Sequence, residues 1–396
     1  MAVPKLRFKA DDGSDYPEWN DFTRLENISA FITKGATPTT YGFDWQPNGV
    51  YFFRNDCIKN NVFVYGDYSF ITEEANKFLQ RSEVTGGDII IAITGDIGKV
   101  GLIPSEVKKA NINQHLARVR IVKDTFPYFV YMYLCSDKVQ RTYKKIKTGL
   151  SMPQLSLAQI RDTNIPVVSL PEQQKIAEFL STVDTVIEKQ KDTVSAWEER
   201  KKGVMQKLFS QEVRFKADDG SEFPEWEEKK LGECCDILDS KRKPISKENR
   251  VLGKYAYYGS TNIQDYINEY LFDEPLVLLA EDAGPFDDFW NKAIAQFATG
   301  KFWVNNHAHV LRPHENRKYF FYSLEHRDIR VYINNPSRGK LNQEDMVKIP
   351  MYIPCLAEQQ KIADCLSSFD EVIEKQKATL AVWEELKKGL LQQMFV

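Results

Sequence analysis

The sequence of 396 residues is too long for one ordinary hydrophobic core, since domains commonly contain about 150 residues, and we expect two or three folded units. The formal net charge of −3 excludes a uniformly basic protein, so a nucleic-acid site would have to be built from local patches. No apolar run reaches the roughly 18 residues of a membrane span, and the first residues lack the apolar stretch of a signal peptide. We therefore expect a cytoplasmic protein without a membrane partner.

A turn-rich motif at residues 6–19 returns at residues 213–226 with 11 of 14 identities. Its Asp-Asp-Gly-Ser segment is typical of a bend, and the Pro-Glu-Trp that follows leads into the next segment. The repeat predicts a tandem duplication, in which a short motif, a variable segment and a long helix each occur twice. We expect the motif itself to have an architectural role.

The first variable segment, residues 20–166, combines strand-like runs with Gly and Pro punctuation and predicts a mixed α/β domain. A helix is expected over residues 126–147, with Pro127 in its first turn. Residues 138–147 contain no acid, and this basic surface is either simply solvated or neutralises DNA phosphates. Strands are expected at residues 50–54, 62–65, 88–93 and 116–122, and the candidate DNA-binding residues are Lys138, Arg141, Lys144, Lys145 and Lys147.

A long helix is predicted at residues 172–209 and again at residues 358–395, with 24 of 38 identities. Its apolar residues step by four and three, which is typical of a coiled-coil seam. Polar residues interrupt the seam at the same positions in both copies, and such residues can fix the register between helices. The seam residues are Ile176, Leu180, Val183, Ile187, Gln190, Val194 and Trp197 in the first copy and Ile362, Leu366, Phe369, Ile373, Gln376, Leu380 and Trp383 in the second, with Lys201 and Lys387 as a further polar pair.

Two similar units joined in one chain tend to pack about a pseudo-twofold axis, so we expect the two helices to run antiparallel as a coiled coil. The sequence leaves open that each is instead an amphipathic helix on its own globular core. The expected fold class is α+β, with two mixed α/β domains separated by the two long helices.

The second variable segment, residues 227–354, has almost no identity with the first but keeps its landmarks in the same order. Residues 111–120 correspond to residues 304–312, and a glycine followed by a leucine precedes each long helix. This pattern predicts the same scaffold with a different surface. Lys and Arg can read base edges or neutralise phosphate, although an ordinary loop surface accounts for such clusters equally well. The candidate DNA-binding residues here are Lys241, Arg242, Lys243, Arg327, Arg330, Arg338 and Lys340.

Fragments that look like catalytic or cofactor-binding motifs are incomplete. The pair Gly98–Lys99 lacks the spacing and the following Ser or Thr of a phosphate loop. The acidic pairs Glu281–Asp282 and Asp287–Asp288 lack the nearby Glu-x-Lys of a magnesium-dependent nuclease. The six cysteines and five histidines show no metal-ligand spacing. We therefore predict no catalytic residue, metal site or cofactor in this chain.

Two unlike domains are each followed by a helix that begins with Glu-Gln-Gln-Lys-Ile-Ala, at residues 172–177 and 358–363. Further short motifs lie in the variable segments at Gly35–Pro38, Gly87–Ile89, Gly98–Lys99, Tyr257–Gly259 and Lys301–His307. In these features, and over essentially its whole length, the chain resembles the DNA-specificity subunit of a type I restriction-modification enzyme, with its two target-recognition domains and two spacer helices.

The resemblance implies a non-catalytic subunit that reads a two-part target in double-stranded DNA, with one half-site for each variable domain. It also implies that the chain holds two methyltransferase subunits and the restriction/translocase subunits, and that S-adenosylmethionine, ATP and Mg²⁺ belong to those partners. Two alternatives stay open: a coiled-coil scaffold for other proteins, and a nuclease or methyltransferase with an unrecognised motif. The expected division is a first target-recognition domain at 1–167, a central spacer helix at 168–211, a second target-recognition domain at 212–354 and a C-terminal spacer helix at 355–396.

Overall fold

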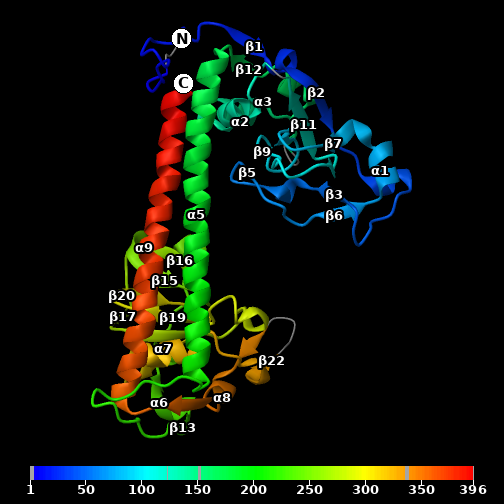
Figure 1. Ribbon diagram of the computed structural model, residues 1–396. Coiled ribbons are helices and arrows are strands. Elements are labelled where there is room, and N and C mark those ends of the chain that lie inside the picture. The colour runs from blue at the N-terminus through cyan, green and yellow to red at the C-terminus, as the bar shows by residue number, and fades with distance from the viewer. Residues whose placement is uncertain (1–3, 123, 150–152, 335–338, 396) are drawn as a thin grey trace. The chain divides into compact units, whose positions relative to one another are not determined.

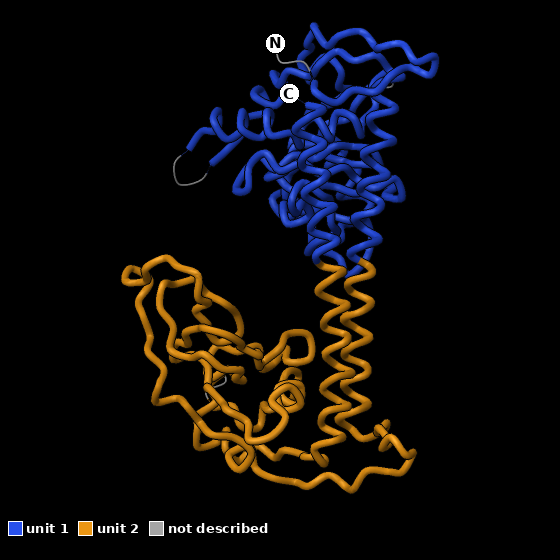
Figure 2. The backbone as a smooth tube through the Cα atoms, turned by 90° about the vertical axis from the view of Figure 1, so that its left-hand side faces the viewer, with its two compact units in different colours: residues 1–191, 378–396 blue, residues 192–377 orange. Residues whose placement is uncertain are grey.

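The computed structural model describes residues 4–122, 124–149, 153–334 and 339–395, and no helix within these ranges is long and apolar enough to cross a membrane. The chain divides into two compact units, residues 1–191 with 378–396, and residues 192–377 (Figure 2). Each unit contains one globular domain and part of each of two long helices, α5 (Leu170–Phe209) and α9 (Leu356–Met394) (Figure 1). The predicted α+β fold class is confirmed, and the four-part division into domains and spacers stays a prediction.

The globular domain of the first unit is built on two four-stranded sheets and two two-stranded ones, in the part of the chain that the structure describes. One four-stranded sheet is antiparallel with the order β2-β11-β8-β9, and the other has the order β6-β3-β10-β7 with a parallel pairing of β3 and β10. The two-stranded sheets pair β1 with β12 and β4 with β5. The strands are β1 (Phe22–Arg24), β2 (Ser29–Lys34), β3 (Val50–Phe53), β4 (Ile58–Lys59), β5 (Val62–Phe63), β6 (Ser69–Ile71), β7 (Glu83–Val84), β8 (Ile89–Ala92), β9 (Val100–Leu102), β10 (Ala110–Ile112), β11 (Leu116–Ile121) and β12 (Asn164–Pro166), and the helices are α1 (Glu73–Phe78), α2 (Pro127–Cys135), α3 (Asp137–Ile146) and α4 (Leu157–Arg161).

The globular domain of the second unit repeats this topology. Its sheets have the orders β14-β21-β18-β19 and β16-β15-β20-β17, the pairing of β15 with β20 is parallel, and β13 pairs with β24. The strands are β13 (Glu227–Lys230), β14 (Cys235–Ile237), β15 (Leu252–Tyr258), β16 (Ile263–Ile267), β17 (Phe272–Asp273), β18 (Leu276–Ala280), β19 (Ala295–Ala298), β20 (Lys301–Val304), β21 (Ala308–Pro313), β22 (Ile333–Asn334), β23 (Lys340–Leu341) and β24 (Pro350–Ile353), and the helices are α6 (Leu231–Cys234), α7 (Arg317–Glu325) and α8 (Gln343–Met346). The prediction that one scaffold is used twice is confirmed.

The central strands β8 and β18 are uninterrupted apolar runs because both of their faces are covered. In β8, Ile89 and Ile91 pack with α2, while the alternate residues Ile90 and Ala92 pack with the second sheet. In β18 the same alternation holds from Leu276 to Leu279, and every residue of the strand is buried. Each domain therefore consists of a helix layer and two sheet layers, and the sheet that contains the central strand lies between the helix layer and the other sheet.

The helix expected over residues 126–147 is wrong in one respect, because the structure breaks it into α2 and α3 at Ser136. This serine has an extended backbone, with φ −63° and ψ 149°, and it precedes the first residue of α3. The side-chain amide of Gln140 donates to the carbonyl of Leu134 at 2.8 Å and thereby satisfies one of the free carbonyl groups at the end of α2. Asp137 then lies in the first turn of α3, where an acidic side chain is favourable next to the positive end of the helix dipole.

The long helices run antiparallel within each unit. Near the start of α5, Asp184 pairs with Lys387 near the end of α9 at 2.6 Å, and Asp370 near the start of α9 pairs with Lys201 near the end of α5 at 2.8 Å. The predicted seam residues Ile176, Leu180, Val183, Ile187, Val194, Ile362, Leu366 and Ile373 are buried, and Gln190, Trp197, Phe369, Gln376, Leu380 and Trp383 are half-buried. The two helices lie side by side in both views (Figures 1 and 2).

The lysines at the polar seam positions also fix the coil to the globular domains. Lys201 lies 2.8 Å from carboxylate oxygens of both Glu325 and Asp370, and the hydroxyl of Tyr322 donates to Asp370 at 2.6 Å. Burial by itself lowers the pKa of Lys201, but the two carboxylates outweigh it and raise the pKa above its ordinary value. We call Lys201, Glu325, Asp370 and Tyr322 the lysine cluster.

A buried glutamate explains the repeated motif of the second unit. Glu358, at the start of α9, is fully buried and accepts two hydrogen bonds from Arg214, at 3.1 and 2.9 Å, and one from the indole of Trp226 at 2.9 Å. Arg214 also donates to the carbonyls of Phe223 and Pro224. We call this arrangement of Arg, Trp and Glu the clasp.

The first unit contains the same clasp. Glu172, at the start of α5, is fully buried and accepts two hydrogen bonds from Arg7 at 3.0 Å and one from Trp19 at 3.1 Å. The turn-rich motif therefore has a definite physical role, which is to bring an arginine and a tryptophan onto the first turn of a long helix, where the carboxylate also faces the positive end of the helix dipole.

Candidate nucleic-acid interface

A turn of sequence Asn-x-His lies at the same place in both domains, between β10 and β11 and between β20 and β21. In the first domain, the Asn113 side chain accepts from the backbone of His115 at 3.1 Å, and in the second the Asn305 side chain accepts from the backbone of His307 at 2.7 Å. The backbone amides of both asparagines donate to the parallel strand that neighbours β10 or β20 in the same sheet, at 3.0 Å to the Phe53 carbonyl and 3.1 Å to the Tyr258 carbonyl. We call these two segments the reading turns.

Each reading turn exposes its middle residue. The asparagines are buried, the histidines are half-buried, and Gln114 and Asn306 are exposed. The buried asparagine therefore fixes the backbone, and the exposed amide side chain is held at the junction of the two sheets. Amide side chains at such a position can make paired hydrogen bonds to the edge of adenine.

The polar neighbours of the two reading turns differ. In the first domain, the Thr37 hydroxyl donates to the side-chain oxygen Oε1 of Gln114, and the side-chain nitrogen Nε2 of Gln114 lies 3.1 Å from Nε2 of His115. In the second domain, Nδ1 of His307 lies 2.7 Å from a carboxylate oxygen of Asp282. The two turns consequently present different patterns of donors and acceptors on the same backbone.

The predicted basic run of the first domain is connected to its reading turn through a series of contacts. Lys138, Arg141, Lys144, Lys145 and Lys147 are all exposed. Residue Thr148 bridges to Gln154, and Gln154 bridges to Thr94. The Thr94 carbonyl accepts from Asn55 at 3.3 Å, and Asn55 in turn accepts from Asn113 at 3.3 Å. The end of the basic run and the reading turn are therefore linked through three intermediate residues.

The predicted residue Arg242 has an internal role in the second domain, and we correct its assignment as a DNA contact. Its guanidinium lies 2.5 Å from Glu281 and 3.3 Å from Asp239, and only 14% of its side chain is exposed. It also donates to the carbonyl of Ala308, next to the reading turn, at 2.8 Å. Arg242 therefore positions its exposed neighbours Lys241 and Lys243 beside that turn, with its own charge already neutralised.

The other predicted basic residues of the second domain divide into three groups. Arg327 is half-buried among aromatic side chains, so we no longer expect it to contact DNA. Arg330 is exposed and paired through two bonds with Asp328, at 2.9 and 2.7 Å, and its DNA contact stays a prediction. Lys340 is exposed and lies 3.7 Å from Glu281. Arg338 lies outside the described residues.

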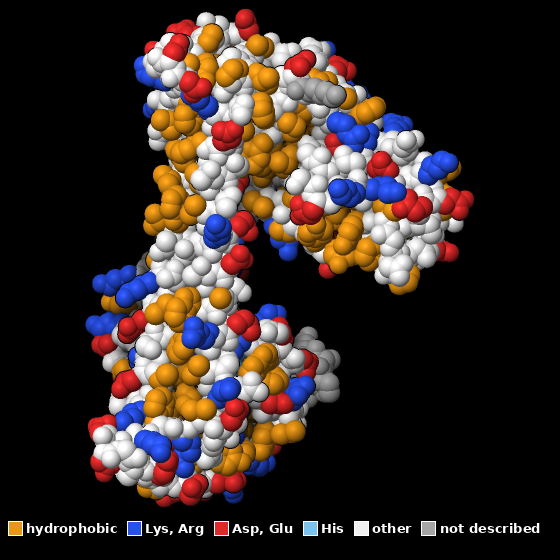
Figure 3. All heavy atoms as spheres, in the orientation of Figure 1, with side chains coloured by type: hydrophobic (Ala, Val, Ile, Leu, Met, Phe, Trp, Pro, Cys, Tyr) orange, Lys and Arg blue, Asp and Glu red, His pale blue; other side chains and the backbone are white. Residues whose placement is uncertain are grey.

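Charges are mixed over the surface. On the face seen in Figure 3, Lys and Arg side chains are interspersed with Asp and Glu rather than gathered into one continuous basic surface. This agrees with the net charge of −3. A DNA-binding surface of this protein would therefore be local, as the reading turns and their neighbouring lysines are.

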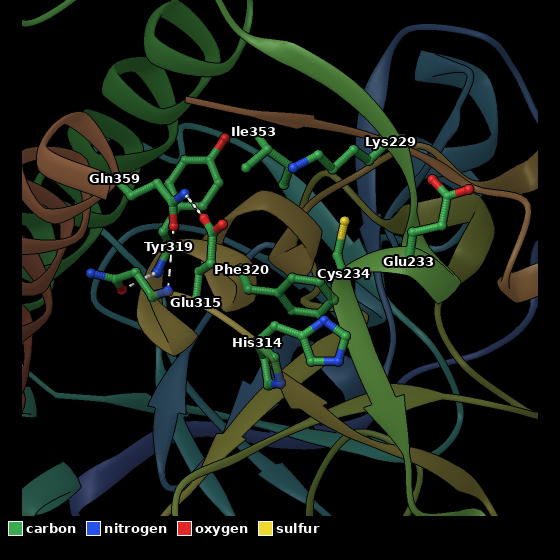
Figure 4. A pocket seen from close by; sticks show the side chains of 11 residues that line it. Lys229, Glu233, Cys234, His314, Glu315, Tyr319, Phe320, Ile353 and Gln359 are labelled. Atoms are coloured by element: carbon green, nitrogen blue, oxygen red, sulfur yellow. Dashed lines mark hydrogen bonds between the residues drawn. The ribbon is translucent and has the colours of Figure 1, made fainter. Parts of the chain in front are cut away.

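A small pocket between β13, β21 and α7 brings a cysteine and a histidine together (Figure 4). Its volume is ≈ 50 Å³. The Cys234 thiol donates to the Lys230 carbonyl at 3.4 Å and points away from the His314 ring, which is itself paired with Asp236 at 3.0 Å. Burial raises the pKa of Cys234, so the group is a thiol rather than the thiolate that a nucleophile requires.

One group of acids and a histidine lies at metal-ligand spacing. Asp239, Glu281 and His309 have ligand atoms within 4.8 Å of one another. The guanidinium of Arg242 already pairs with both carboxylates, and the His309 ring contacts Asp239 at 2.5 Å and the Leu341 carbonyl at 2.9 Å. The group is an internal ion-pair network that supports the second reading turn.

Comparison with known proteins agrees with this architecture. Residues 17–194 and 224–382 each match the family model described as the type I restriction modification DNA specificity domain. The two matches cover most of the chain, and each spans one globular domain and the first part of the long helix that follows it. The chain therefore belongs to the family of type I restriction-modification DNA specificity proteins. Within such a system it is a specificity subunit, which is the non-catalytic component.

Individual relatives give the same result. The type I restriction enzyme MjaVIII specificity subunit of Methanocaldococcus jannaschii is 23% identical over 97% of this chain and 94% of its own. A specificity subunit homologue of Haemophilus influenzae is 37% identical, over only 38% of each chain. Among solved structures, the S subunit of a type I restriction-modification system from M. genitalium has a TM-score of 0.57 at 17% identity and covers 100% of this chain and 99% of its own, which shows a shared fold.

Proposed function

We propose that each globular domain reads one half-site of a bipartite target in double-stranded DNA, and that its reading turn contacts the bases. The observation that carries this proposal is the pair of reading turns. They share one backbone but differ in the length of the exposed amide side chain, Gln114 or Asn306, and in the polar groups beside the turn. One scaffold that presents two different hydrogen-bonding patterns is what two independent half-sites require, because base identity is read through donors and acceptors in the major groove.

Exchange of one domain tests this proposal. Replacing residues 20–150 by the equivalent segment of a relative should change one half of the methylated target and leave the other half unchanged. Each base pair that no longer matches should weaken binding by about 1–3 kcal/mol, so the old half-site should be lost outright. The measurement is the methylated sequence motif of cells that carry the exchanged chain. A change in both halves together would show that the domains do not read independently.

The exposed basic run should contact phosphate rather than bases. Changing Lys144, Lys145 and Lys147 to glutamine should weaken binding to all DNA sequences about equally and flatten the slope of log K against log salt by ~0.9 for each lysine. Titration of duplex DNA at several salt concentrations measures this slope. Lys77→Gln, at an exposed position on α1, is the matched control and should leave the slope unchanged. If the triple variant keeps the original slope, the basic run is an ordinary solvated surface.

We also propose that the chain holds two methyltransferase subunits and the restriction/translocase subunits, and that S-adenosylmethionine, ATP and Mg²⁺ bind to those partners. Family membership supports this, as does the fold shared with a chain from a study of complex assembly of the type I R-M system, which has a TM-score of 0.51 at 18% identity. A protein scaffold that does not bind DNA would lack the salt-dependent binding described above. The cytoplasmic location stays a prediction.

A further inference from the structure

A cavity of ≈ 240 Å³ lies within the second unit, between the end of α5 and α7. Its wall is largely aromatic and includes Phe209, Trp226, Tyr319 and Tyr322. Two further aromatic residues that line it, Trp290 and Tyr352, are 39% and 41% exposed, so the cavity is accessible from solvent. An exposed aromatic cavity is unusual unless something covers it, because aromatic area in contact with water is unfavourable.

An arginine without an ion pair lies in this aromatic wall. Among the described residues, Arg327 has no carboxylate partner, and its guanidinium donates to the sulfur of Met351 at 3.4 Å and lies 5.9 Å from the ring of Tyr352. Burial lowers the pKa of Arg327, although not enough to remove the charge of a guanidinium. A half-buried cation in apolar surroundings favours the binding of an anion.

The first unit shows how the equivalent space can be filled. Phe129 of α2 and Tyr319 of α7 are equivalent, because each packs edge-on against the tryptophan of its clasp, at 6.1 and 6.2 Å between ring centroids. Four residues further along each helix stand Tyr133 and Ser323. Tyr133 packs edge-on against Phe395 at 5.6 Å, and Ser323 has no ring to place there. The cavity therefore lies where the first unit has a tyrosine side chain.

The charge at the equivalent position of the chain is also reversed, at the start of α3 in the first unit and just after the end of α7 in the second. Eight residues after Phe129 comes Asp137, which accepts from the amide of Gln392 in α9 at 3.0 Å. Eight residues after Tyr319 comes Arg327, and the equivalent glutamine, Gln206 of α5, lines the cavity beside it. The second unit thus lacks one aromatic ring and has a cation where the first unit has a carboxylate.

We propose that this cavity is a docking site for a partner polypeptide that inserts one aromatic side chain and places an adjacent carboxylate against Arg327. The ring would take the place that Tyr133 occupies in the first unit, and the carboxylate would supply the missing ion pair. The volume of ≈ 240 Å³ is below the roughly 300–1,000 Å³ of small-molecule pockets and suits a single side chain. The site is separate from the reading turns and does not depend on the proposed DNA recognition.

Capped tetrapeptides added to the full chain test the proposal. Acetyl-Ser-Asp-Phe-Ser-amide should bind saturably and change the fluorescence of Trp226 and Trp290, which line the cavity. The peptide with asparagine in place of aspartate should bind at least about tenfold more weakly, because it cannot pair with Arg327. Phenylacetate is the third probe. If it binds more tightly than the acidic peptide, the site takes a free aromatic acid and the docking proposal is overturned.

Variants of the chain complete the test. Arg327→Gln should abolish the preference for the acidic peptide, and Ser323→Tyr, which copies the first unit, should abolish the binding of both peptides. Arg200→Gln is the matched control, at an exposed arginine of α5 in the same unit, and it should bind as the unchanged chain does. The proposal is overturned if no probe binds saturably, if both peptides bind the unchanged chain equally, or if Arg327→Gln keeps the preference.

Discussion

Replacing Glu358 by glutamine should lower the free energy of unfolding of the second unit by about 2–4 kcal/mol. The carboxylate of Glu358 is fully buried in the clasp, where Arg214 and Trp226 donate three hydrogen bonds to it. Glutamine has nearly the same size but no charge, so the variant leaves the guanidinium without its buried counter-ion. We expect a smaller loss of stability than the ~3–5 kcal/mol for breaking a fully buried ion pair, because 17% of the Arg214 side chain is exposed.

Hydrogen exchange measured by mass spectrometry can assign this loss to one unit. Glu358→Gln should increase exchange in the strands of the second unit, and the matched variant Glu172→Gln should do so in the first. Glu228→Gln is the control, because Glu228 is exposed on β13 and its substitution should change stability by less than about 0.5 kcal/mol. Unaltered exchange of β18 in Glu358→Gln would contradict a stabilising role for the clasp.

Replacing Lys201 by methionine should cost about 3–5 kcal/mol of stability in the second unit. Only 9% of the Lys201 side chain is exposed, and its removal leaves the carboxylates of Glu325 and Asp370 close together without a cation. The pKa of Lys201 is raised in the folded protein, so its stabilising contribution is fully present below the pKa of about 10.4 of an unfolded lysine. The contribution is lost only as the pH rises through the folded-state pKa.

Urea unfolding at neutral pH measures this cost. Lys207→Met, at an exposed position of the same helix, is the control. Lys387→Met in the first unit should cost less, because within the described part of the chain Lys387 pairs with only one carboxylate, that of Asp184. Combining Lys201→Met with Glu325→Gln and Asp370→Asn should restore part of the stability, since neutral groups of similar size can replace a buried ion-pair network. A triple variant no more stable than Lys201→Met would show that stranded charge is not the cause.

The duplication, the long helices and the central strand of the first domain could be predicted because each leaves a repeated, periodic or uninterrupted apolar pattern in the sequence. The clasp could not be predicted in the same way. Glu172 and Glu358 stand at the first turn of a helix, where an acidic residue is ordinary, and nothing local indicates that an arginine about 150 residues away buries them. Contacts of that sequence separation depend on tertiary structure.

Which of the candidate DNA-binding residues are free to contact DNA also depends on tertiary structure. The sequence identified Arg242 and Lys241 alike as cations. The acids that neutralise Arg242 are Asp239, three residues earlier, and Glu281, which directly follows β18 and is brought to Arg242 only by the fold. The Asn-x-His landmark was visible in both halves of the chain. Its position at the junction of two sheets follows from the parallel pairing of β3 with β10 and of β15 with β20, which joins strands far apart in the sequence.

The last part of α9 belongs to the first unit, and this affects the order in which the two units can be completed during synthesis. Met394 and Phe395 are buried in the same core as Ile176 and Leu180, whereas the second unit is one continuous stretch, residues 192–377. Chains emerge from the ribosome N-terminus first, at about 5–20 residues per second. The second unit therefore has all of its residues once residue 377 has emerged, while the first unit, begun earlier, waits for residues 378–396. The domain translated first is completed last. Until then, α9 does not cover the apolar face of α5 in the first unit, and this face is exposed to solvent or to other proteins.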